Sequence, residues 1–451
     1  MIHKFRLNGY NIVLDVNSGA VHVLDDLAFD ILDFVDEDMQ PELSSHAVCA
    51  LSQTYNSDDI AGAYTELYEL FKSGQLFAAD TYQAYTSLLV NAPIKSMCIN
   101  IAHDCTLRCE YCFAAKGDFG TGRELMPLGT AKAAIDFIVE HSGNRRNLEV
   151  DFFGGEPLMN FDVLKSTVEY ARSLEPLYNK NFRFTVTTNG LLLTPDKIDF
   201  INREMSNVVL SLDGRQKVND ELRVTPNGRG CYDLIVPKYR ELVAGRAGKD
   251  YYVRGTFTRN NLDFTADVLN IYDLGFDQIS IEPVVADSSL DYAICESDLL
   301  RIFDEYETLA KEIITRKKNG KCFNFFHFML DLDQGPCAIK RLRGCSCGNE
   351  YVAVTPNGDI YPCHQFVGVD CWKMGNVLEN TLDSSIKDRF AHTNVYTKEK
   401  CQSCWAKFFC SGGCNANNWQ YAGDIANAHD ISCELEKKRL ECALMIKAAT
   451  L

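Results

Sequence analysis

The sequence predicts an α/β protein of three successive units: a small unit of strands and then helices, a partial (β/α)6 barrel, and a cysteine-rich region. Hairpin patterns give way to helical periodicity within the first 80 residues, six strand-helix units follow, and cysteines gather near the end. At 451 residues the chain is too long for one hydrophobic core. We therefore place units at residues 1–80, 97–320 and 321–451, with a linker at 81–96.

The composition is that of an ordinary globular protein, with 46% hydrophobic and 24% charged residues. No apolar run approaches the roughly 20 residues that a membrane span needs, and the first residues lack a signal-peptide core. We therefore expect a cytoplasmic protein without a membrane partner. The formal charge of −17 argues against nonspecific nucleic-acid binding, which needs basic surface.

Nineteen cysteines without an export signal indicate metal or redox chemistry. A disulfide scaffold is not expected, because a reducing compartment keeps thiols reduced.

The first 80 residues are expected to form three strands, at 3–7, 10–15 and 20–24, followed by three helices. Asn8-Gly9 and Asn17-Ser18-Gly19 are strong hairpin signals between the strands. Apolar periodicity then marks helices near 27–35, 43–51 and 60–71, with Asp25 or Asp26 as the first cap and Gly74 as the last stop.

This order resembles the winged-helix-like, PqqD-type peptide recognition element. In that family a leader peptide adds a strand to the exposed sheet edge. A nonfunctional extension would give a similar pattern. Acidic residues outnumber basic ones fourteen to three within residues 1–90, which fits either a solvated surface or a docking face for a basic partner.

From Met97 onward, strand and helix patterns alternate, which requires a parallel sheet with helical crossovers. The expected strands are 97–102, 148–153, 182–187, 208–212, 251–256 and 278–281. The expected helices are near 127–141, 161–174, 195–203, 232–243, 261–274 and 297–316. Chemistry in parallel barrels is found at the carboxyl ends of the strands, so the functional residues are sought there.

The loop after the first barrel strand reads D-C-T-L-R-C-E-Y-C-F, with Cys105, Cys109 and Cys112 spaced C-x3-C-x2-C. Three such thiolates can hold three irons of a [4Fe-4S] cluster and leave the fourth iron open. The alternatives are buried thiols or structural zinc, which usually has four closed ligands. The spacing, with Tyr111 before the third cysteine, resembles the radical S-adenosylmethionine (SAM) enzymes, in which SAM occupies the open position.

Polar residues also follow the later strands. Gly154, Gly155 and Glu156 begin a G-G-E-P turn that resembles the radical SAM motif for the methionyl amino group, which assigns that role to Glu156. The resemblance further implies ribose contacts from short polar side chains, an aromatic contact to adenine from Tyr111, and a carboxylate contact from Arg254. The ribose candidates are Thr187, Asn189, Ser211 and Asp213. Simple turns, packing or a structural salt bridge are the alternatives.

The cysteines after residue 345 follow a long pattern of intervals. Cys345 precedes Gly358 by twelve intervening residues, and Cys363 follows after four; then comes C401-x2-C404-x5-C410-x3-C414, with Cys433 after a gap. This resembles the SPASM domain, which carries two auxiliary [4Fe-4S] clusters. Zinc ribbons are the alternative for C-x2-C pairs.

By motif position, one auxiliary cluster takes Cys401, Cys404, Cys410 and Cys433. The other takes Cys345, Cys363 and Cys414. The sequence leaves three possibilities for its fourth ligand: Cys347, Cys337 or no protein ligand. In the last case a substrate thiolate could bind the iron.

Taken whole, the chain resembles the SPASM maturases of six-cysteine (SCIFF) peptides. The resemblance implies three [4Fe-4S] clusters and SAM, a flavodoxin- or ferredoxin-type electron donor, and a cysteine-rich precursor peptide whose leader binds the N-terminal unit. A 5′-deoxyadenosyl radical would open the reaction, which ends in a thioether crosslink of the sactipeptide or ranthipeptide type. The alternatives are another SPASM reaction, such as sulfatase maturation, peptide epimerisation or carbon-carbon crosslinking, and a noncatalytic electron carrier.

Overall fold

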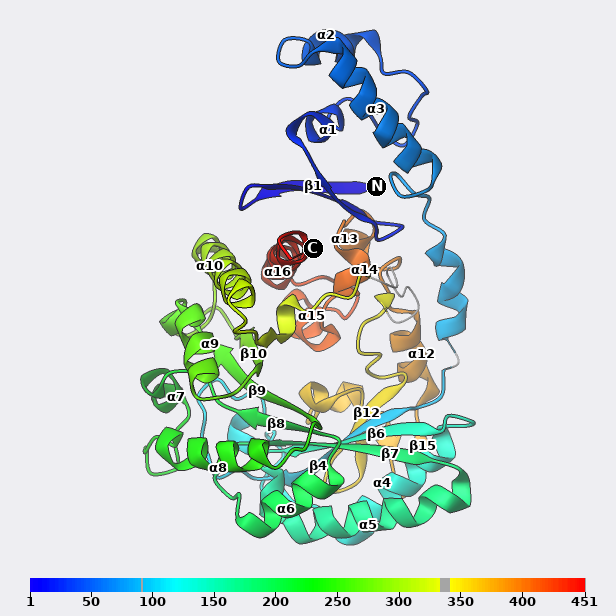
Figure 1. The fold of residues 1–451 in the computed structure, drawn as a ribbon. Helices are drawn as coiled ribbons and strands as arrows, with labels where there is room; N and C mark the ends of the chain where they lie inside the picture. Colours follow the sequence, from blue (N-terminus) through cyan, green and yellow to red (C-terminus); the bar gives the residue numbers. More distant parts are fainter. Residues whose placement is uncertain (91, 333–340, 451) are drawn as a thin grey trace.

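The computed structural model describes residues 1–90, 92–332 and 341–450. Figure 1 shows a small N-terminal unit at one end, a sheet with helices along its outer face at the other, and the C-terminal region between them. Within the described ranges no helix combines the length and apolarity needed to cross a bilayer.

The predicted order of the N-terminal unit is confirmed. An antiparallel sheet, in the order β1 (Ile2–Leu7), β2 (Tyr10–Asp15) and β3 (Val21–Leu24), precedes the helices α1 (Asp26–Ile31), α2 (Ser45–Leu51) and α3 (Ser57–Lys72). Asn8 and Gly9 both have positive φ, as a tight hairpin turn requires. The Asp25 side chain caps α1 by accepting from Ala28 N–H.

Strand β2 is buried on both faces. Val13 joins the core formed with α1 and α3, whereas Ile12 and Leu14 join the main core that includes residues of α16 (Asp430–Ala448). Because successive side chains of a strand point to opposite faces, one strand holds two layers together. The N-terminal unit is therefore joined to the rest of the molecule by apolar packing.

The six predicted barrel strands are confirmed as parallel neighbours. They are β4 (Ser96–His103), β6 (Asn147–Gly154), β7 (Asn181–Thr188), β8 (Asn207–Ser211), β9 (Asp250–Phe257) and β10 (Gln278–Pro283). Figure 1 shows α4 (Leu128–His141), α5 (Phe161–Tyr178), α6 (Pro195–Glu204) and α8 (Tyr232–Ala244) along one side of this sheet. The remaining helices of this part are α7 (Gln216–Leu222), α9 (Phe264–Asp273) and α10 (Leu299–Lys318), and short strands β5 (Glu124–Leu125) and β11 (Asn324–Phe325) pair with β4 and β10.

The sheet does not stop at the boundary that we placed after residue 320. Strand β12 (Tyr351–Val354) pairs in parallel with β4, and antiparallel strands β13 (Asp359–Tyr361), β14 (Gly375–Asn376) and β15 (Thr381–Leu382) extend it. Where the structure describes this region, its helices are α12 (Ser384–His392), α13 (Glu399–Gln402), α14 (Lys407–Cys410), α15 (Asn415–Ala422) and α16. Strand β12 thus joins the cysteine-rich C-terminal region to β4, the strand that precedes Cys105.

Candidate active site

A cavity of about 270 Å³ lies at the carboxyl ends of the parallel strands. Its lining joins the Cys105–Cys112 loop, the ends of β6 to β10 and part of the C-terminal region. A larger hollow of about 950 Å³ lies at the opposite strand ends, around residues such as Asn207, Asp250 and Gln278. We place the active site in the smaller cavity, because it contains the cysteine loop and the strand ends that carry chemistry in parallel sheets.

The three cysteines of the loop meet at this cavity. Burial raises the pKa of Cys105 and of Cys109 to about 12, and the thiols lie close enough to influence one another. Leu107 N–H lies 3.4 Å from Cys105 Sγ. Burial raises the pKa of Cys112 as well, and backbone hydrogen bonds from Ala114, Lys116 and Gly117 partly offset this rise. Sulfurs supplied with N–H donors fit the thiolate ligands of an iron-sulfur cluster.

No three His, Cys, Asp or Glu side chains of the described residues close around one metal-ion position. A [4Fe-4S] cluster takes its thiolates one per iron, so its ligands do not converge on a point.

Tyr111 is fixed by a buried charge cluster. Its hydroxyl donates to Asp213 Oδ2 at 2.5 Å and accepts from Arg223 Nη1 at 2.9 Å. Asp213 is 1% exposed and also accepts from Thr256 N–H at 3.0 Å. The aromatic residue of the cysteine loop is therefore anchored to the end of β8, while the adenine contact stays a prediction.

Gly154 and Gly155 allow β6 to approach the cysteine loop. A Cβ on Gly154 would lie 2.3 Å from Ala102 O, and one on Gly155 would lie 2.2 Å from Asp104 O. Gly155 N–H donates to Ala102 O, and Glu156 N–H donates to Asp104 O, both at 2.8 Å. Both glycines line the cavity.

Glu156 is 1% exposed, and its carboxylate already accepts three hydrogen bonds. The donors are Leu158 N–H, Thr188 Oγ1 and Asn189 N–H, at 2.8 to 3.0 Å. This carboxylate joins the ends of β6 and β7, and its contact with an amino group stays a prediction.

Four further candidates line the cavity: Thr187, Asn189, Ser211 and Arg254. The amide of Asn189 lies 3.4 Å from Cys105 Sγ, which adds a side-chain donor to that sulfur. Arg254 pairs with Glu282 at 2.7 Å. The side chain of Arg254 is 47% exposed and faces the cavity, so both its structural and its ligand roles fit this position.

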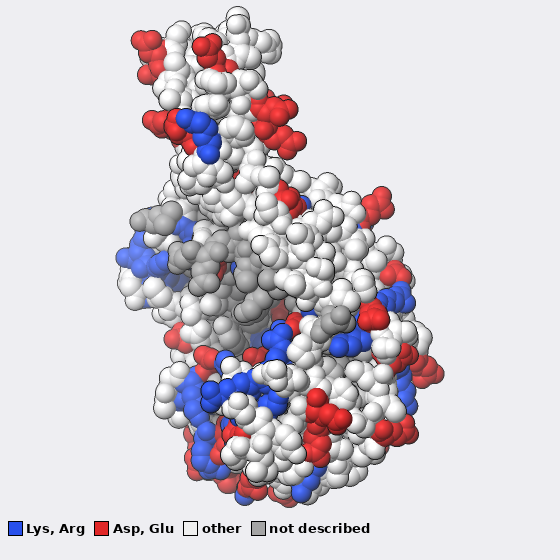
Figure 2. All heavy atoms as spheres, turned by 90° about the vertical axis from the view of Figure 1, so that its right-hand side faces the viewer, with Lys and Arg blue, Asp and Glu red and all other residues white. Residues whose placement is uncertain are grey.

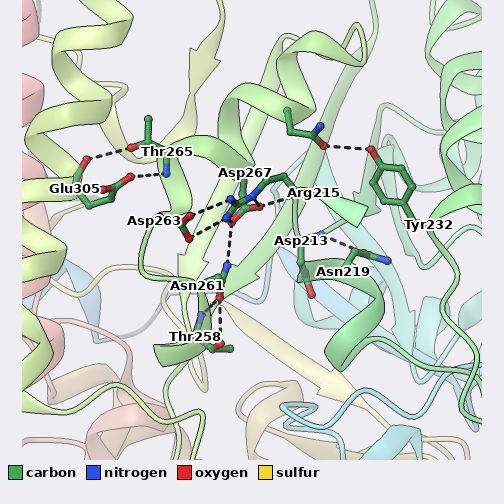
Figure 3. Close-up of polar contacts among 11 residues, drawn as sticks. Asp213, Arg215, Asn219, Tyr232, Thr258, Asn261, Asp263, Thr265, Asp267 and Glu305 are labelled. Atoms are coloured by element: carbon green, nitrogen blue, oxygen red, sulfur yellow. Dashed lines mark hydrogen bonds and ion pairs between the residues drawn. The ribbon is translucent and has the colours of Figure 1, made fainter. Parts of the chain in front are cut away.

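Figure 3 shows the polar contacts that hold the loop after β8. Arg215 binds the buried carboxylate of Asp267 through Nε at 2.8 Å and the exposed carboxylate of Asp263 through Nη2 at 2.8 Å. Asn261 also donates to Asp267. The network ties the segment that begins with Asp213 to α9 and to the end of β9.

The first auxiliary set lies together, and Cys347 is within it. Hydrogen bonds join the thiols of Cys345 and Cys347 and those of Cys347 and Cys363. Burial and the nearby Cys345 both raise the pKa of Cys414. Asn415 Nδ2 lies 3.5 Å from Cys347 Sγ. Cys337 lies outside the described residues. Four sulfurs and an amide donor fit a cluster at this position.

The second auxiliary set lines a separate cavity of about 400 Å³, which contains Cys401, Cys404, Cys410 and Cys433. The N-terminal unit reaches its rim, because Lys407 pairs with Asp80 at 3.0 Å and Trp405 stacks on His3 at a ring distance of 3.6 Å. Four thiols around a hollow fit a closed four-ligand cluster.

Sequence reasoning missed several cavity residues. Three of them come from the C-terminal region and line the active-site cavity of about 270 Å³: His364, Gln365 and Asn417. Their closeness to Cys363 and Cys414 in sequence was an available signal. Arg223, which contacts Tyr111, carries no such signal, since α7 was not predicted.

Two family models match parts of the chain. Residues 99–236 match the Radical SAM superfamily, and residues 345–405 match SPASM, described as an iron-sulfur cluster-binding domain.

Among proteins with similar sequences is the cysteine-type anaerobic sulfatase-maturating enzyme of Clostridium novyi. It is 25% identical over 336 residues, which are 70% of this chain and 86% of that protein.

Two solved structures share the fold. Native anSMEcpe with bound AdoMet and Cp18Cys peptide has a TM-score of 0.65 at 18% identity, covering 79% of this chain and 99% of that one. Streptococcus suis SuiB bound to precursor peptide SuiA has a TM-score of 0.54 at 18% identity, covering 96% of this chain and 98% of that one.

Proposed function

We propose that this chain, which carries a radical SAM domain followed by a SPASM domain, installs cysteine thioether crosslinks in a ribosomally made, cysteine-rich precursor peptide. The observation that carries the proposal is the shared cavity. One hollow is lined by the Cys105–Cys112 loop and by His364, Gln365 and Asn417, which neighbour first-set cysteines in sequence. A peptide in this cavity would lie between the Cys105–Cys112 loop and the first auxiliary set.

Aromatic packing supports the same placement. His364 stacks on Phe153 at 4.9 Å and lies 5.1 Å from Phe113, two residues that flank the G-G-E-P turn and the cysteine loop. These three rings form an apolar part of the cavity wall, which would help to keep water away from a bound peptide. Exclusion of water protects a reactive intermediate from side reactions.

The bound cofactors would supply the electron balance. For each C–S bond formed, one hydrogen atom would pass from the acceptor carbon to a 5′-deoxyadenosyl group. One proton would leave the thiol for solvent or a base, and one electron would pass to a cluster. The protein's own residues position these groups. Tyr111, Asp213 and Arg223 fix the cysteine loop, and Arg254 offers a cation to a carboxylate. The thiol of Cys347, placed with three other cysteines, favours a first cluster closed by protein ligands.

The N-terminal unit would bind the leader. Strand β3 is the sheet edge next to β2, and Val23 on it is 46% exposed. An extended leader could add a strand there by main-chain hydrogen bonds. Figure 2 shows acidic side chains over this end of the molecule, which suits a leader with basic residues. An electron donor of flavodoxin or ferredoxin type completes the proposed partners.

The test uses cluster-loaded protein, reductant, SAM and a cysteine-rich precursor encoded beside the gene. We expect 5′-deoxyadenosine and a peptide lighter by two hydrogens per crosslink, with a mass that thiol reductant does not restore. Reversal by reductant means disulfide formation and contradicts the proposal.

Two variants separate the steps. Cys105→Ala should abolish 5′-deoxyadenosine formation, whereas Cys347→Ala should retain it and lose the crosslink. If the precursor is untouched but a sulfatase-derived cysteine peptide is oxidised to an aldehyde, the reaction is that of the Clostridium novyi relative instead.

A further inference from the structure

Lys398 is a buried lysine between the two C-terminal cysteine sets. It is 2% exposed, and its ammonium donates to Gly412 O at 2.7 Å and to Asn415 Oδ1 at 2.9 Å. Gly412 lies in sequence between Cys410 of the second set and Cys414 of the first. The cation is therefore held by the segment that links the two sets.

The titratable groups that act on Lys398 are cysteine thiols. Cys401 and Cys410 of the second set and Cys347 and Cys414 of the first all act on it electrostatically. In the described part of the chain, no carboxylate forms an ion pair with it, whereas nearby Lys407 pairs with Asp80 at 3.0 Å. Burying an unpaired cation is costly, so a compensating negative charge is expected. Clusters with thiolate ligands would provide that charge.

Asn415 extends the contact to one sulfur. Its carbonyl oxygen accepts from the Lys398 ammonium, and its amide nitrogen lies 3.5 Å from Cys347 Sγ. The ammonium polarises the amide and strengthens its N–H donor, because hydrogen bonds in a chain reinforce one another. Net charge and hydrogen bonds to sulfur both set the potential of an iron-sulfur cluster.

We propose that Lys398 is a positioning residue that raises the reduction potentials of both auxiliary clusters, and that Asn415 adds a further increase at the first cluster alone. A buried positive charge stabilises the reduced, more negative state, and burial protects the interaction from screening by salt. The proposal rests on the cluster assignment of the proposed function and is independent of the peptide product.

The test is a redox titration followed by electron paramagnetic resonance. All proteins carry Cys105→Ala, Cys109→Ala and Cys112→Ala, so that only the auxiliary clusters respond, and iron and sulfide are measured for each. Lys398→Met and Lys398→Gln should lower both potentials. At a fixed applied potential we expect the reduced-to-oxidised ratio to fall about tenfold, which is about 59 mV for a one-electron couple.

Three variants give the contrasts. Lys398→Arg keeps the charge and should keep both potentials, and Asn415→Leu should lower only the first. Lys400→Met is the matched control: Lys400 lies near the second set, but its side chain is 60% exposed and pairs with Asp430 at 2.5 Å. It should shift neither potential, because solvent screens an exposed charge.

Unchanged potentials in fully loaded Lys398→Met or Lys398→Gln would overturn the proposal. If Lys398→Met and Lys398→Gln both lose iron, the test rests on Asn415→Leu. An unshifted potential of the first auxiliary cluster in that variant would overturn the proposal, because only a structural role would be left for Lys398. Missing auxiliary clusters in the parent protein would refute the cluster assignment itself. Shifted potentials without any peptide modification would refute the thioether function and leave this inference standing.

Discussion

At the scale of single residues, Gly155 is tightly constrained by the backbone around it. Its missing side chain makes room for the carbonyl of Asp104, which the absent Cβ would approach to 2.2 Å. No positive φ is required, so contact alone selects glycine. We expect Gly155→Ala to cost several kcal/mol, since backbone cannot move aside as a side-chain tip can.

A lower unfolding temperature and loss of iron from the Cys105–Cys112 loop would show the cost of this clash. Gly129→Ala is the control: its Cβ would meet nothing within 4 Å in α4, so stability should stay equal or rise by up to about 1 kcal/mol. An equal loss in both variants would contradict the clash.

Asp151 gives a prediction about pH. Burial, together with the nearby Glu149 carboxylate, raises the pKa of Asp151 to about 6. A carboxyl with a raised pKa stabilises the fold while protonated, and this contribution is lost as the pH rises from its unfolded pKa through 6. Asp151→Asn should therefore stabilise the protein by up to about 3 kcal/mol at pH 8 and by about 1 kcal/mol less at pH 5.

Thermal unfolding at the two pH values measures this difference. Asp199→Asn, on the exposed face of α6, should change stability little at either pH. A pH-independent gain in Asp151→Asn would show that its ionisation is not the cause.

Among single residues, the cysteine positions could be predicted because motif spacing fixes them. The grouping of Cys347 with Cys345 and Cys363 could not, since two candidate cysteines and an open iron fitted the sequence equally. Arg223 and Lys398 were also missed. A buried cation cannot be recognised in a sequence without knowing which groups surround it.

At the scale of elements, the loop after β8 depends on one arginine with two unlike partners. Arg215 contacts Asp267, which is fully buried, and Asp263, whose side chain is 52% exposed (Figure 3). Asp267→Asn should destabilise the protein by about 1.5 to 3 kcal/mol, because the buried Asp267 loses its charge-assisted hydrogen bonds to Arg215, whose side chain is 36% exposed. Asp263→Asn should cost below about 1 kcal/mol, as an exposed pair does.

The same pair tests the connection to the cavity, since this loop carries Asp213. We expect weaker SAM binding, measured by calorimetry, in Asp267→Asn and unchanged binding in Asp263→Asn. Equal binding in both would show that the network does not position the cavity wall.

Strands and helices with strong periodicity were predicted closely, and the six parallel strands β4 and β6 to β10 lie within two residues of expectation. Helix α7 was missed because seven residues, Gln216–Leu222, give too little periodicity. Strand β12 and its pairing with β4 were also missed, because short strands in a glycine-rich, cysteine-rich region carry no clear alternation. Local pattern determines element type, whereas pairing across about 250 residues depends on tertiary contacts.

At the scale of the whole molecule, the N-terminal sheet has two separable surfaces. Leu14 on β2 is buried in the core shared with α16, whereas Val23 on the β3 edge is 46% exposed. Leu14→Asp should cost about 3 to 5 kcal/mol through a buried unpaired charge and should speed protease cleavage within residues 82–89. Val23→Asp should leave stability and proteolysis unchanged and weaken leader-peptide binding.

Proteolysis, thermal unfolding and peptide-binding measurements on both variants provide the comparison. Intact leader binding in Val23→Asp would place the leader elsewhere. Unchanged protease resistance in Leu14→Asp would show that β2 does not hold the unit to α16.

The packing of β1 and β2 against α16 also constrains synthesis. His3 hydrogen-bonds to Glu441, 438 residues later in the chain. At about 5 to 20 residues per second, a ribosome needs roughly 20 to 90 seconds to travel that distance. Throughout that time Ile12 and Leu14 lack the helix that covers them, so the nascent chain carries an exposed apolar strand. Chaperones that bind such strands during translation should therefore determine how much of this protein reaches the folded state.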